Sequence, residues 1–326
     1  MRPPRYWYDG GGFLPVVLSP IGSLYGMAGR LRMVLSKGEK ALVPVICIGN
    51  LVAGGAGKTP VALSVAERLI SKGVAVHFLS RGYGGHETGP LRVDPEKHTA
   101  ADVGDEPLLL SAVAPTWIAA DRPAGARAAA GGADVIVMDD GFQNPSLEKD
   151  LSIVVVDGEA GFGNGKLIPA GPLRERPEVG LRRAQAVAII GGGESPLPSA
   201  IADSGLPILR GYLTPGDEAN RLKNKPVVAF AGIARPEKFF ATLRGIGCDV
   251  AETCGFGDHH PFSQRNIDAI RKRATELNAV MVTTEKDAVR LDPEFRNEVE
   301  VLTVRITWQD TGALESLLQP FVTGAI

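Results

Sequence analysis

Short apolar runs that alternate with glycine-rich turns and helical segments are the feature of this sequence that most constrains its fold. These runs have the length of buried strands and lie at residues 43–48, 74–79, 117–120, 135–138 and 153–156. Strands that alternate with helices predict an α/β fold whose mostly parallel sheet is covered by helices on both faces. Polar residues follow several of the runs, at the carboxyl edge of the sheet, where open α/β sheets bind ligands.

A segment rich in proline, glycine and arginine, residues 161–183, separates these runs from a second set of elements. Further strands are predicted at residues 186–190, 227–231, 249–252, 280–284 and 299–304, with helices at 237–244 and 263–277. We therefore predict an N-terminal segment 1–40, a larger α/β domain 41–183 and a second, smaller α/β domain 184–326. The cleft between the two domains is the expected site of chemistry.

Charge and cysteine content exclude two classes of protein. Lysine and arginine number 35 against 37 aspartates and glutamates, a net charge of -2, which argues against a dedicated nucleic-acid-binding protein. The 3 cysteines are too few and too scattered for a disulfide scaffold or a four-ligand zinc site. This usage is typical of a reducing compartment.

The N-terminal segment 1–40 is basic, in contrast to the rest of the chain. Only Asp9 and Glu39 oppose its basic residues, which are Arg2, Arg5, Arg30, Arg32, Lys37 and Lys40, so its net charge is +4. The uncharged run 13–29 is short for a membrane-spanning helix, and Pro15 and Pro20 interrupt it.

Apolar residues recur at helical spacing from residue 21 to residue 35, and a helix start is predicted at Ser19 and Pro20. We predict an amphipathic helix that lies in a membrane interface, with its basic residues near anionic headgroups. A helix packed on the body of the protein is the alternative. A cleaved signal peptide is disfavoured because no small-x-small cleavage site follows.

A glycine-rich loop between a predicted strand and a predicted helix carries the strongest local signal. Its sequence is Gly54-Gly55-Ala56-Gly57-Lys58-Thr59, preceded by Val52 and Ala53. Glycines let backbone N–H groups approach phosphate oxygens, Lys58 reaches the outer phosphates, and the Thr59 hydroxyl can ligate Mg²⁺. Val52 stands where the strict P-loop pattern has glycine, but the other features outweigh this departure. We predict an ATP-binding P-loop formed by residues 52–59.

Two acids follow the predicted strand 135–138, namely Asp139 and Asp140. A P-loop needs a carboxylate at the end of a neighbouring strand to complete the Mg²⁺ shell, so these acids fit that requirement. Gln143, three residues later, could hold a water or a substrate hydroxyl, and a simple turn is an equally good interpretation.

Phosphoryl transfer would also need a group that takes a proton and cations that hold the moving phosphoryl group. Acid candidates are Asp105 and Glu106, and base candidates are His259 and His260, which sit together in a polar turn. Candidate phosphate clamps are Arg81 and Arg174, for which a surface salt bridge is an equal alternative. A further motif, Thr284-Glu285-Lys286-Asp287, is similar to a guanine-reading motif but has the wrong lysine spacing, so no GTP specificity is inferred.

Together these motifs resemble one family, the tetraacyldisaccharide 4'-kinases or lipid A 4'-kinases, over nearly the whole chain. Val52 fits the variant loop of that family. The motifs that carry the resemblance are Pro4 to Gly10 with Trp7, Gly49-Asn50-Leu51 before the P-loop, Ser80 to Gly84, Gly104 to Pro107, Asp139 to Gln143, Pro169 to Glu175, Asp258 to His260 and Thr284 to Asp287.

The resemblance implies ATP- and Mg²⁺-dependent phosphorylation of the 4'-hydroxyl of a tetraacylated glucosamine disaccharide 1-phosphate, which gives lipid IVA. It implies a peripheral enzyme on the cytoplasmic face of a Gram-negative inner membrane, held there by the N-terminal helix. Partners would be the acylated disaccharide and the membrane surface, with no nucleic acid and no obligate protein partner. The local positive charge also suits anionic lipid, at about 1 kcal/mol per basic residue.

The resemblance also implies roles for individual residues. Asp105 with His259 would accept the hydroxyl proton, and His259 is favoured over His260 because it directly follows Asp258. Lys58, Arg81 and Arg174 would act on the phosphates. The metal set would be Thr59, Asp139, Asp140 and Glu106, with Gln143 and Glu175 as further site residues.

Two other functions are compatible with the motifs. A P-loop ATPase that couples hydrolysis to partner binding or metal delivery would turn over ATP without a lipid acceptor. A nucleotide-sensing protein with negligible turnover would keep its biological activity when Asp105 is replaced by alanine.

Overall fold

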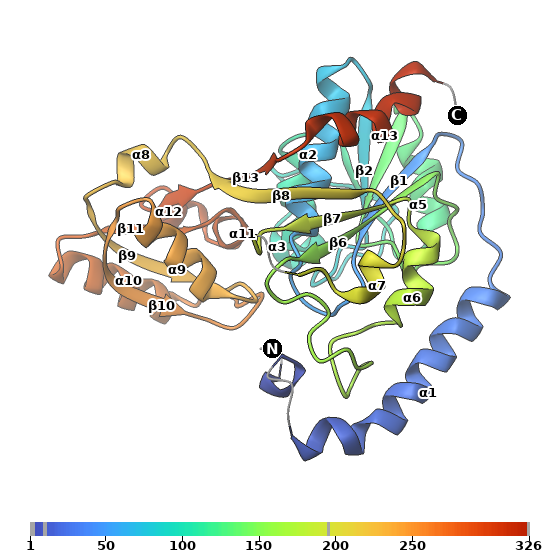
Figure 1. The fold of residues 1–326 in the computed structure, drawn as a ribbon. Helices are drawn as coiled ribbons and strands as arrows, with labels where there is room; N and C mark the ends of the chain where they lie inside the picture. The colour runs from blue at the N-terminus through green and yellow to red at the C-terminus, as the bar shows by residue number, and fades with distance from the viewer. Residues whose placement is uncertain (1–3, 9–11, 194–195, 325–326) are drawn as a thin grey trace.

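The computed structural model describes residues 4–8, 12–193 and 196–324 (Figure 1). Arg2 and Asp9, which contribute to the charge of the N-terminal segment, and Gly10, which ends its first motif, lie outside the described residues. A short 3-10 helix, η1 (Arg5–Trp7), precedes the long helix α1 (Phe13–Leu35), and the remaining elements form two sheets with their helices.

In the described part of the chain, nine strands form one sheet in the order β13-β8-β7-β6-β1-β5-β2-β4-β3. All its pairs are parallel except β13 with β8 and β3 with β4. Its strands are β1 (Val45–Gly49), β2 (Val76–Ser80), β3 (Leu91–Arg92), β4 (Thr116–Ile118), β5 (Val135–Asp139), β6 (Leu151–Asp157), β7 (Ala186–Ile190), β8 (Ile208–Pro215) and β13 (Val304–Trp308).

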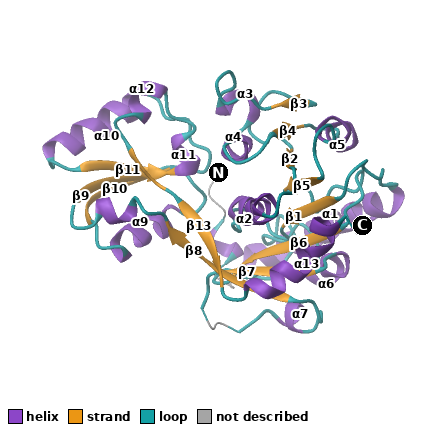
Figure 2. Ribbon diagram, turned by 90° about the horizontal axis from the view of Figure 1, so that it is seen from above, coloured by secondary structure: helices purple, strands orange, loops and turns teal. Residues whose placement is uncertain are grey.

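Helices cover both faces of this sheet, as predicted; Figure 2 shows α2 and α4 on one side and α5 and α6 on the other. Every residue of β1 and β5 is buried, as expected for strands sandwiched between two helical layers. The helices of this part are α2 (Lys58–Ser71), α3 (Ala100–Val103), α4 (Asp105–Ser111), α5 (Arg122–Ala129), α6 (Pro177–Gly180), η2 (Leu181–Arg183), α7 (Ser199–Ala202) and α13 (Thr311–Thr323).

A second, smaller sheet has four parallel strands among the described residues, in the order β10-β9-β11-β12. Successive residues of β9 face opposite layers: Val227 and Ala229 pack toward α9, and Val228 and Phe230 pack toward α10 and α12. The elements are β9 (Pro226–Ala231), β10 (Asp249–Gly255), β11 (Val280–Thr284), β12 (Glu300–Leu302), α8 (Ala219–Leu222), α9 (Pro236–Gly245), α10 (Gln264–Glu276), α11 (Glu285–Ala288) and α12 (Pro293–Arg296).

The predicted boundary between residues 183 and 184 was wrong. β7 and β8 belong to the large sheet, and the chain returns to that sheet at β13 after completing the small one. We missed β8 and β13 because they pair with each other at the margin of the sheet, where neither strand is a continuous buried apolar run. The small sheet therefore lies within residues 216–303, which are flanked by strands of the large sheet.

The N-terminal helix α1 begins at Phe13, earlier than the start predicted at Pro20. Pro20 lies inside the helix, where it cannot donate a backbone hydrogen bond, while the hydroxyl of Ser19 donates to the carbonyl of Pro15 at 2.6 Å. Figure 1 shows α1 projecting away from the two sheets. Only Pro15 and Gly22 of this helix are buried, and no described helix is both long enough and apolar enough to cross a bilayer.

Candidate active site

The glycine-rich loop joins β1 to α2, as the sequence predicted. Gly57 caps the helix with φ +82 and Gly54 has φ +119, conformations that L residues with a side chain rarely adopt. The amide of Ala53 donates to the carbonyl of Pro172 at 2.7 Å, and Val52 forms a bridge with Leu173. The entry to the loop is therefore held by the segment that leads into Arg174.

The two acids after β5 meet the start of α2 because β1 and β5 are parallel neighbours. The Thr59 hydroxyl donates to Oδ2 of Asp139 at 3.0 Å. Lys58 Nζ lies 3.7 Å from Oδ2 of Asp140. Four of the predicted phosphate and metal residues thus lie at one edge of the sheet.

Asp139 and Asp140 have opposite electrostatic environments. Burial raises the pKa of Asp139 to about 7, against the opposing effect of Lys58. Burial would also raise the pKa of Asp140, but Lys58 and Arg174 outweigh it and lower that pKa. A carboxylate that is costly to ionise in a buried site is well suited to a divalent cation, which would neutralise it.

The residues fit a Mg²⁺ ion by a further observation. Oδ1 of Asp139 is buried and has no hydrogen-bond partner among the described residues, while Oδ2 faces the Thr59 hydroxyl. Buried polar atoms without partners are rare in folded proteins. The unpaired oxygen and the hydroxyl are hard oxygen ligands of the kind that Mg²⁺ prefers.

Arg174 connects the acids to a polar network behind the loop. Its guanidinium donates to both carboxylate oxygens of Asp140, at 3.0 and 3.4 Å, and to Oε1 of Gln143 at 3.3 Å. Gln143 Nε2 donates to the carbonyl of Asn50 and to Glu175, which also pairs with Arg183. Gln143 and Glu175 therefore fix Arg174 against Asp140.

A second cluster lies where α4 meets the small sheet. His259 Nδ1 is 3.1 Å from Oδ1 and 3.0 Å from Oδ2 of Asp105, whose side chain is 2% exposed. His260 points elsewhere: its Nε2 is 3.1 Å from Oδ1 of Asn266, and its ring stacks on Phe256. The geometry therefore favours His259 over His260 as the partner of Asp105.

Lys286 of α11 supplies positive charge to this cluster. Its Nζ lies 2.7 Å from Oε1 of Glu106, 3.4 Å from Nε2 of His259 and 3.9 Å from Oδ2 of Asp105. Burial would raise the pKa of Asp105, but the hydrogen bond from His259 and the charge of Lys286 hold it well below its usual range. The hydrogen bond with Asp105 raises the pKa of His259.

Glu106 lies in this second cluster, apart from the metal set in which we had predicted it. Burial raises its pKa, and Lys286 opposes that rise. Ligand atoms of Asp105, Glu106 and His259 lie within 4.8 Å of one another, a spacing that a metal ion could bridge. The Lys286 ammonium already neutralises Glu106, which disfavours a cation there.

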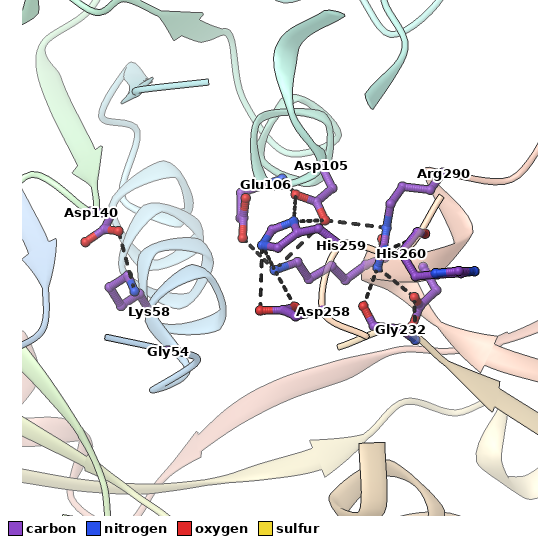
Figure 3. Close-up of polar contacts among 12 residues, drawn as sticks. Gly54, Lys58, Asp105, Glu106, Asp140, Gly232, Asp258, His259, His260 and Arg290 are labelled. Atoms are coloured by element: carbon purple, nitrogen blue, oxygen red, sulfur yellow. Dashed lines mark hydrogen bonds and ion pairs between the residues drawn. The ribbon is translucent and has the colours of Figure 1, made fainter. Parts of the chain in front are cut away.

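Figure 3 shows the two clusters as separate groups, with Lys58 and Asp140 in one and Asp105 and His259 in the other. Arg81 joins neither: it is exposed and makes no hydrogen bond or ion pair with another residue that the structure describes. Its charge is nevertheless close enough to help lower the pKa of Arg122 to about 10, after the larger effect of burial.

Sequence reasoning missed Asn50 and Lys286 as site residues. Asn50 is fully buried, and its side chain donates to the carbonyl of Gly54 at 3.3 Å. Lys286 belonged to a motif that we had compared with base-recognition sequences and counted toward the family resemblance, without assigning Lys286 a role. The signal that could have identified Lys286 is its position two residues after the predicted strand 280–284, at the same kind of strand end as the other polar motifs.

The parallel sheet, the glycine-rich loop that opens α2 and the two acids on the neighbouring strand define the class of P-loop nucleotide-binding α/β proteins. A family model described as "Tetraacyldisaccharide-1-P 4'-kinase" matches residues 14–323. The chain belongs to this family.

Individual relatives agree with the family match. The chain is 53% identical to a tetraacyldisaccharide 4'-kinase of Rhodospirillum centenum, over 99% of this chain and 98% of the relative. It is 51% identical to the protein of the same name from Rhodospirillum rubrum, over 100% and 99% of the two chains. A crystal structure of "apo" form LpxK from Aquifex aeolicus in complex with ATP is similar over 95% of this chain and all of that one, with a TM-score of 0.75 and 26% identity.

Proposed function

We propose that this protein is an ATP-dependent kinase that transfers the γ-phosphoryl group of ATP to the 4'-hydroxyl of a tetraacyl glucosamine-disaccharide 1-phosphate. The product is lipid IVA, an intermediate of lipid A synthesis. The observation that carries the proposal is that a P-loop and an ionised, histidine-paired carboxylate occur in one molecule of this family. The first binds a nucleotide, and the second can accept a proton from an alcohol.

Residues of the first cluster would bind the phosphates and a metal ion. The N-terminus of α2 and the loop amides would hold the phosphate oxygens, with Lys58 on the outer phosphates. Thr59 and Asp139 would hold Mg²⁺, with Asp140 beside them. The ion would neutralise charge on the transferred group. Arg174 keeps the Asp140 carboxylate in place through two hydrogen bonds.

The Asp105–His259 pair would act on the acceptor. The 4'-hydroxyl oxygen forms a bond to the γ-phosphorus, the bond from that phosphorus to the bridging oxygen of ADP breaks, and the hydroxyl proton passes to Asp105. The His259 hydrogen bond orients the carboxylate and keeps it ionised. Because a lowered pKa by itself makes a weaker base, the carboxylate would accept the proton with the help of the His259 imidazole. Arg81, which is exposed directly after β2, would contact phosphate when substrate is bound.

The exposed apolar side chains of α1 support a place at the membrane surface. Leu24, Leu31 and Val34 are 64%, 59% and 81% exposed, and Arg30 and Arg32 lie near the end of the helix. Such large exposed apolar surfaces usually mark an interaction site. We propose that α1 lies in the cytoplasmic leaflet of the inner membrane and brings the enzyme to its acylated substrate.

A few small residues of α1 pack against the segment that contains Lys166 and Leu167. A side-chain carbon at Gly26 would lie 2.6 Å from Cδ1 of Leu167, and one at Gly22 would lie 2.9 Å from the Leu167 carbonyl oxygen. Lys166 Nζ donates to the Ser19 hydroxyl at 3.1 Å. The helix is thus docked by one face and leaves its other apolar side chains for lipid.

The test is to incubate the purified protein with ³²P-labelled ATP, Mg²⁺ and the tetraacyl disaccharide 1-phosphate in detergent micelles. We expect label on the lipid, and none when the disaccharide is omitted. ATP hydrolysis that is indifferent to the disaccharide, with unlabelled lipid, would instead favour a P-loop ATPase that drives another process.

A further inference from the structure

The turn that carries His259 has a backbone conformation that its surroundings must enforce. His259 has φ +56, in the left-handed region that non-glycine residues rarely adopt. Its amide donates to the carbonyl of Gly232, which follows β9, at 3.0 Å, and this bond ties the turn to the end of that strand. The position of the imidazole therefore depends on what holds Gly232 and the neighbouring carbonyls.

Arg290 holds three separate chain segments at this point. Its guanidinium donates to the carbonyls of His260 and Gly232, both at 3.0 Å, and to that of Lys286 at 3.1 Å. The side chain is 7% exposed, so water competes little for these bonds. One rigid group thus joins the His259 turn, the end of β9 and the helix α11.

Asp287 fixes the orientation of that guanidinium. Its fully buried carboxylate accepts from Arg290 Nη2 at 2.6 Å, from the amide of Gly232 at 2.9 Å and from the Thr284 hydroxyl at 2.6 Å. Arg290 Nε is also 3.5 Å from Oδ2 of Asp105, on the far side of the junction between the two sheets. Arg290 therefore contacts the histidine's turn and faces the histidine's partner.

We propose that Arg290 is a positioning residue, which sets the His259 imidazole against Asp105 by clamping the carbonyls of Gly232, His260 and Lys286. The inference rests on the proposed role of the Asp105–His259 pair and gives a purpose to the motif Thr284-Glu285-Lys286-Asp287. A planar guanidinium has five donors in a fixed fork, and four hydrogen bonds use them here. A lysine ammonium has the charge but cannot reproduce that fork.

The first experiment uses Arg290→Lys, which removes the planar guanidinium and keeps the positive charge. We expect kcat for the lipid acceptor to fall about 10- to 100-fold, because small displacements of a reacting group have effects of this size. The KM for ATP should stay within about twofold, because Arg290 makes no contact with the P-loop among the described residues. The matched control is Arg271→Lys, which replaces a surface arginine of α10 that pairs with Glu298 and should leave kcat unchanged.

A double-mutant cycle with His259→Asn separates positioning from general loss of structure. If Arg290 acts through His259, adding Arg290→Lys to His259→Asn should change kcat by less than about twofold. If the losses in kcat of the two single variants multiply in the double variant, the inference is overturned and the proposed function is left intact. A His259→Asn enzyme with full kcat would instead remove the pair from the mechanism, and the inference with it.

A second variant covers the case in which Arg290→Lys does not fold. In Gly232→Ala the new carbon would lie 3.1 Å from Oδ1 of Asp287 and 3.2 Å from Cβ of His260, so it would push the same junction by a few tenths of an ångström. We expect Gly232→Ala to lower kcat in the parent protein. In the His259→Asn background the same substitution should cause little further loss. Unchanged kcat in a folded Gly232→Ala protein, checked by thermal unfolding, would overturn the inference.

Discussion

His259 Nδ1 lies 3.0 Å from Oδ2 of Asp105, although the two residues are 154 positions apart in the sequence. Asp105 begins α4 beside the large sheet, and His259 belongs to a turn of the small sheet. The pair therefore exists only when the two sheets are in this mutual arrangement. Ion pairs from Lys286 and Arg290 to the Asp105 region fix the same junction.

Replacing Asp105 by asparagine should remove the proton acceptor with little change in shape. We expect kcat to fall about 10²-fold or more, the usual effect of losing a positioned base, while ATP still binds. Lipid phosphorylation and equilibrium ATP binding are the two measurements. Asp268→Asn, an exposed aspartate of α10, is the control. An unchanged kcat would remove Asp105 from the mechanism.

Thr59 should be needed for its hydroxyl and not for its shape. Thr59→Val, which keeps the volume, should raise the Mg²⁺ concentration for half-maximal activity about 10-fold or more, because it deletes one oxygen of the predicted shell. Thr59→Ser should stay close to the parent protein. Activity measured against Mg²⁺ concentration, with and without EDTA, checks this. Equal Mg²⁺ curves for valine and serine would contradict the predicted shell.

The contact between Asp157 and α9 predicts a pH-dependent stability. Lys238 Nζ lies 2.9 Å from Oδ2 of Asp157, which Arg235 also contacts. Burial would raise the pKa of Asp157, but these hydrogen bonds lower it below 3.8 in the folded protein. Asp157 therefore stabilises the fold fully above pH 3.8, and this stabilisation is lost as the pH falls through the lower folded-state pKa.

Asp157→Asn should reduce the free energy of unfolding at pH 7 by about 1.5 to 3 kcal/mol, the range for hydrogen bonds to charged groups. The difference from the parent protein should shrink once the pH falls below 3.8. Urea unfolding at a series of pH values measures it, with Asp217→Asn at an exposed position as the control. A difference that stays constant from pH 7 to pH 3 would contradict the assignment.

Charged substitutions on the exposed face of α1 should raise the KM for the lipid substrate without changing the KM for the nucleotide. In the double variant Leu24→Asp, Leu31→Asp we expect weaker binding to anionic vesicles and at least about a 10-fold higher apparent KM for lipid, since each leucine side chain contributes about 1.5 to 3 kcal/mol on burial. The KM for ATP should not change. Ile70→Asp, on the exposed end of α2, is the control. Undiminished vesicle flotation would leave α1 without a membrane role.

The sequence was sufficient for the first cluster because its residues are close to strand ends. Asp139 ends a buried apolar strand, and Thr59 lies across the glycine-rich loop from the end of another; parallel neighbours bring these strand ends to one edge. The α/β fold and the covering helices were predicted for the same reason. The N-terminal helix was also predicted, but its first turns were not, because Pro20 was expected to begin the helix and instead lies within it.

The second cluster could be suspected from the sequence but not assembled from it. No local sequence pattern predicts the contact between Lys286 and Glu106, because that contact depends on how the two sheets pack. The domain boundary failed for a related reason: β13 returns to the large sheet after a long excursion, and strand partners so far apart in sequence leave no local pattern. The assignment of Glu106 to the metal set stays a prediction, and its observed partner is Lys286.

The pairing of β8 with β13 has a consequence for how the molecule is built. Pro215 and Val304 are cross-strand partners in an antiparallel ladder, so the chain ends on either side of residues 216–303 are adjacent. A short turn could join them directly, as in an ordinary hairpin. The small sheet is thus a module inserted into an otherwise continuous nucleotide-binding fold. A chain with the module excised would retain every P-loop residue and both strand-end aspartates, yet would lack the histidine.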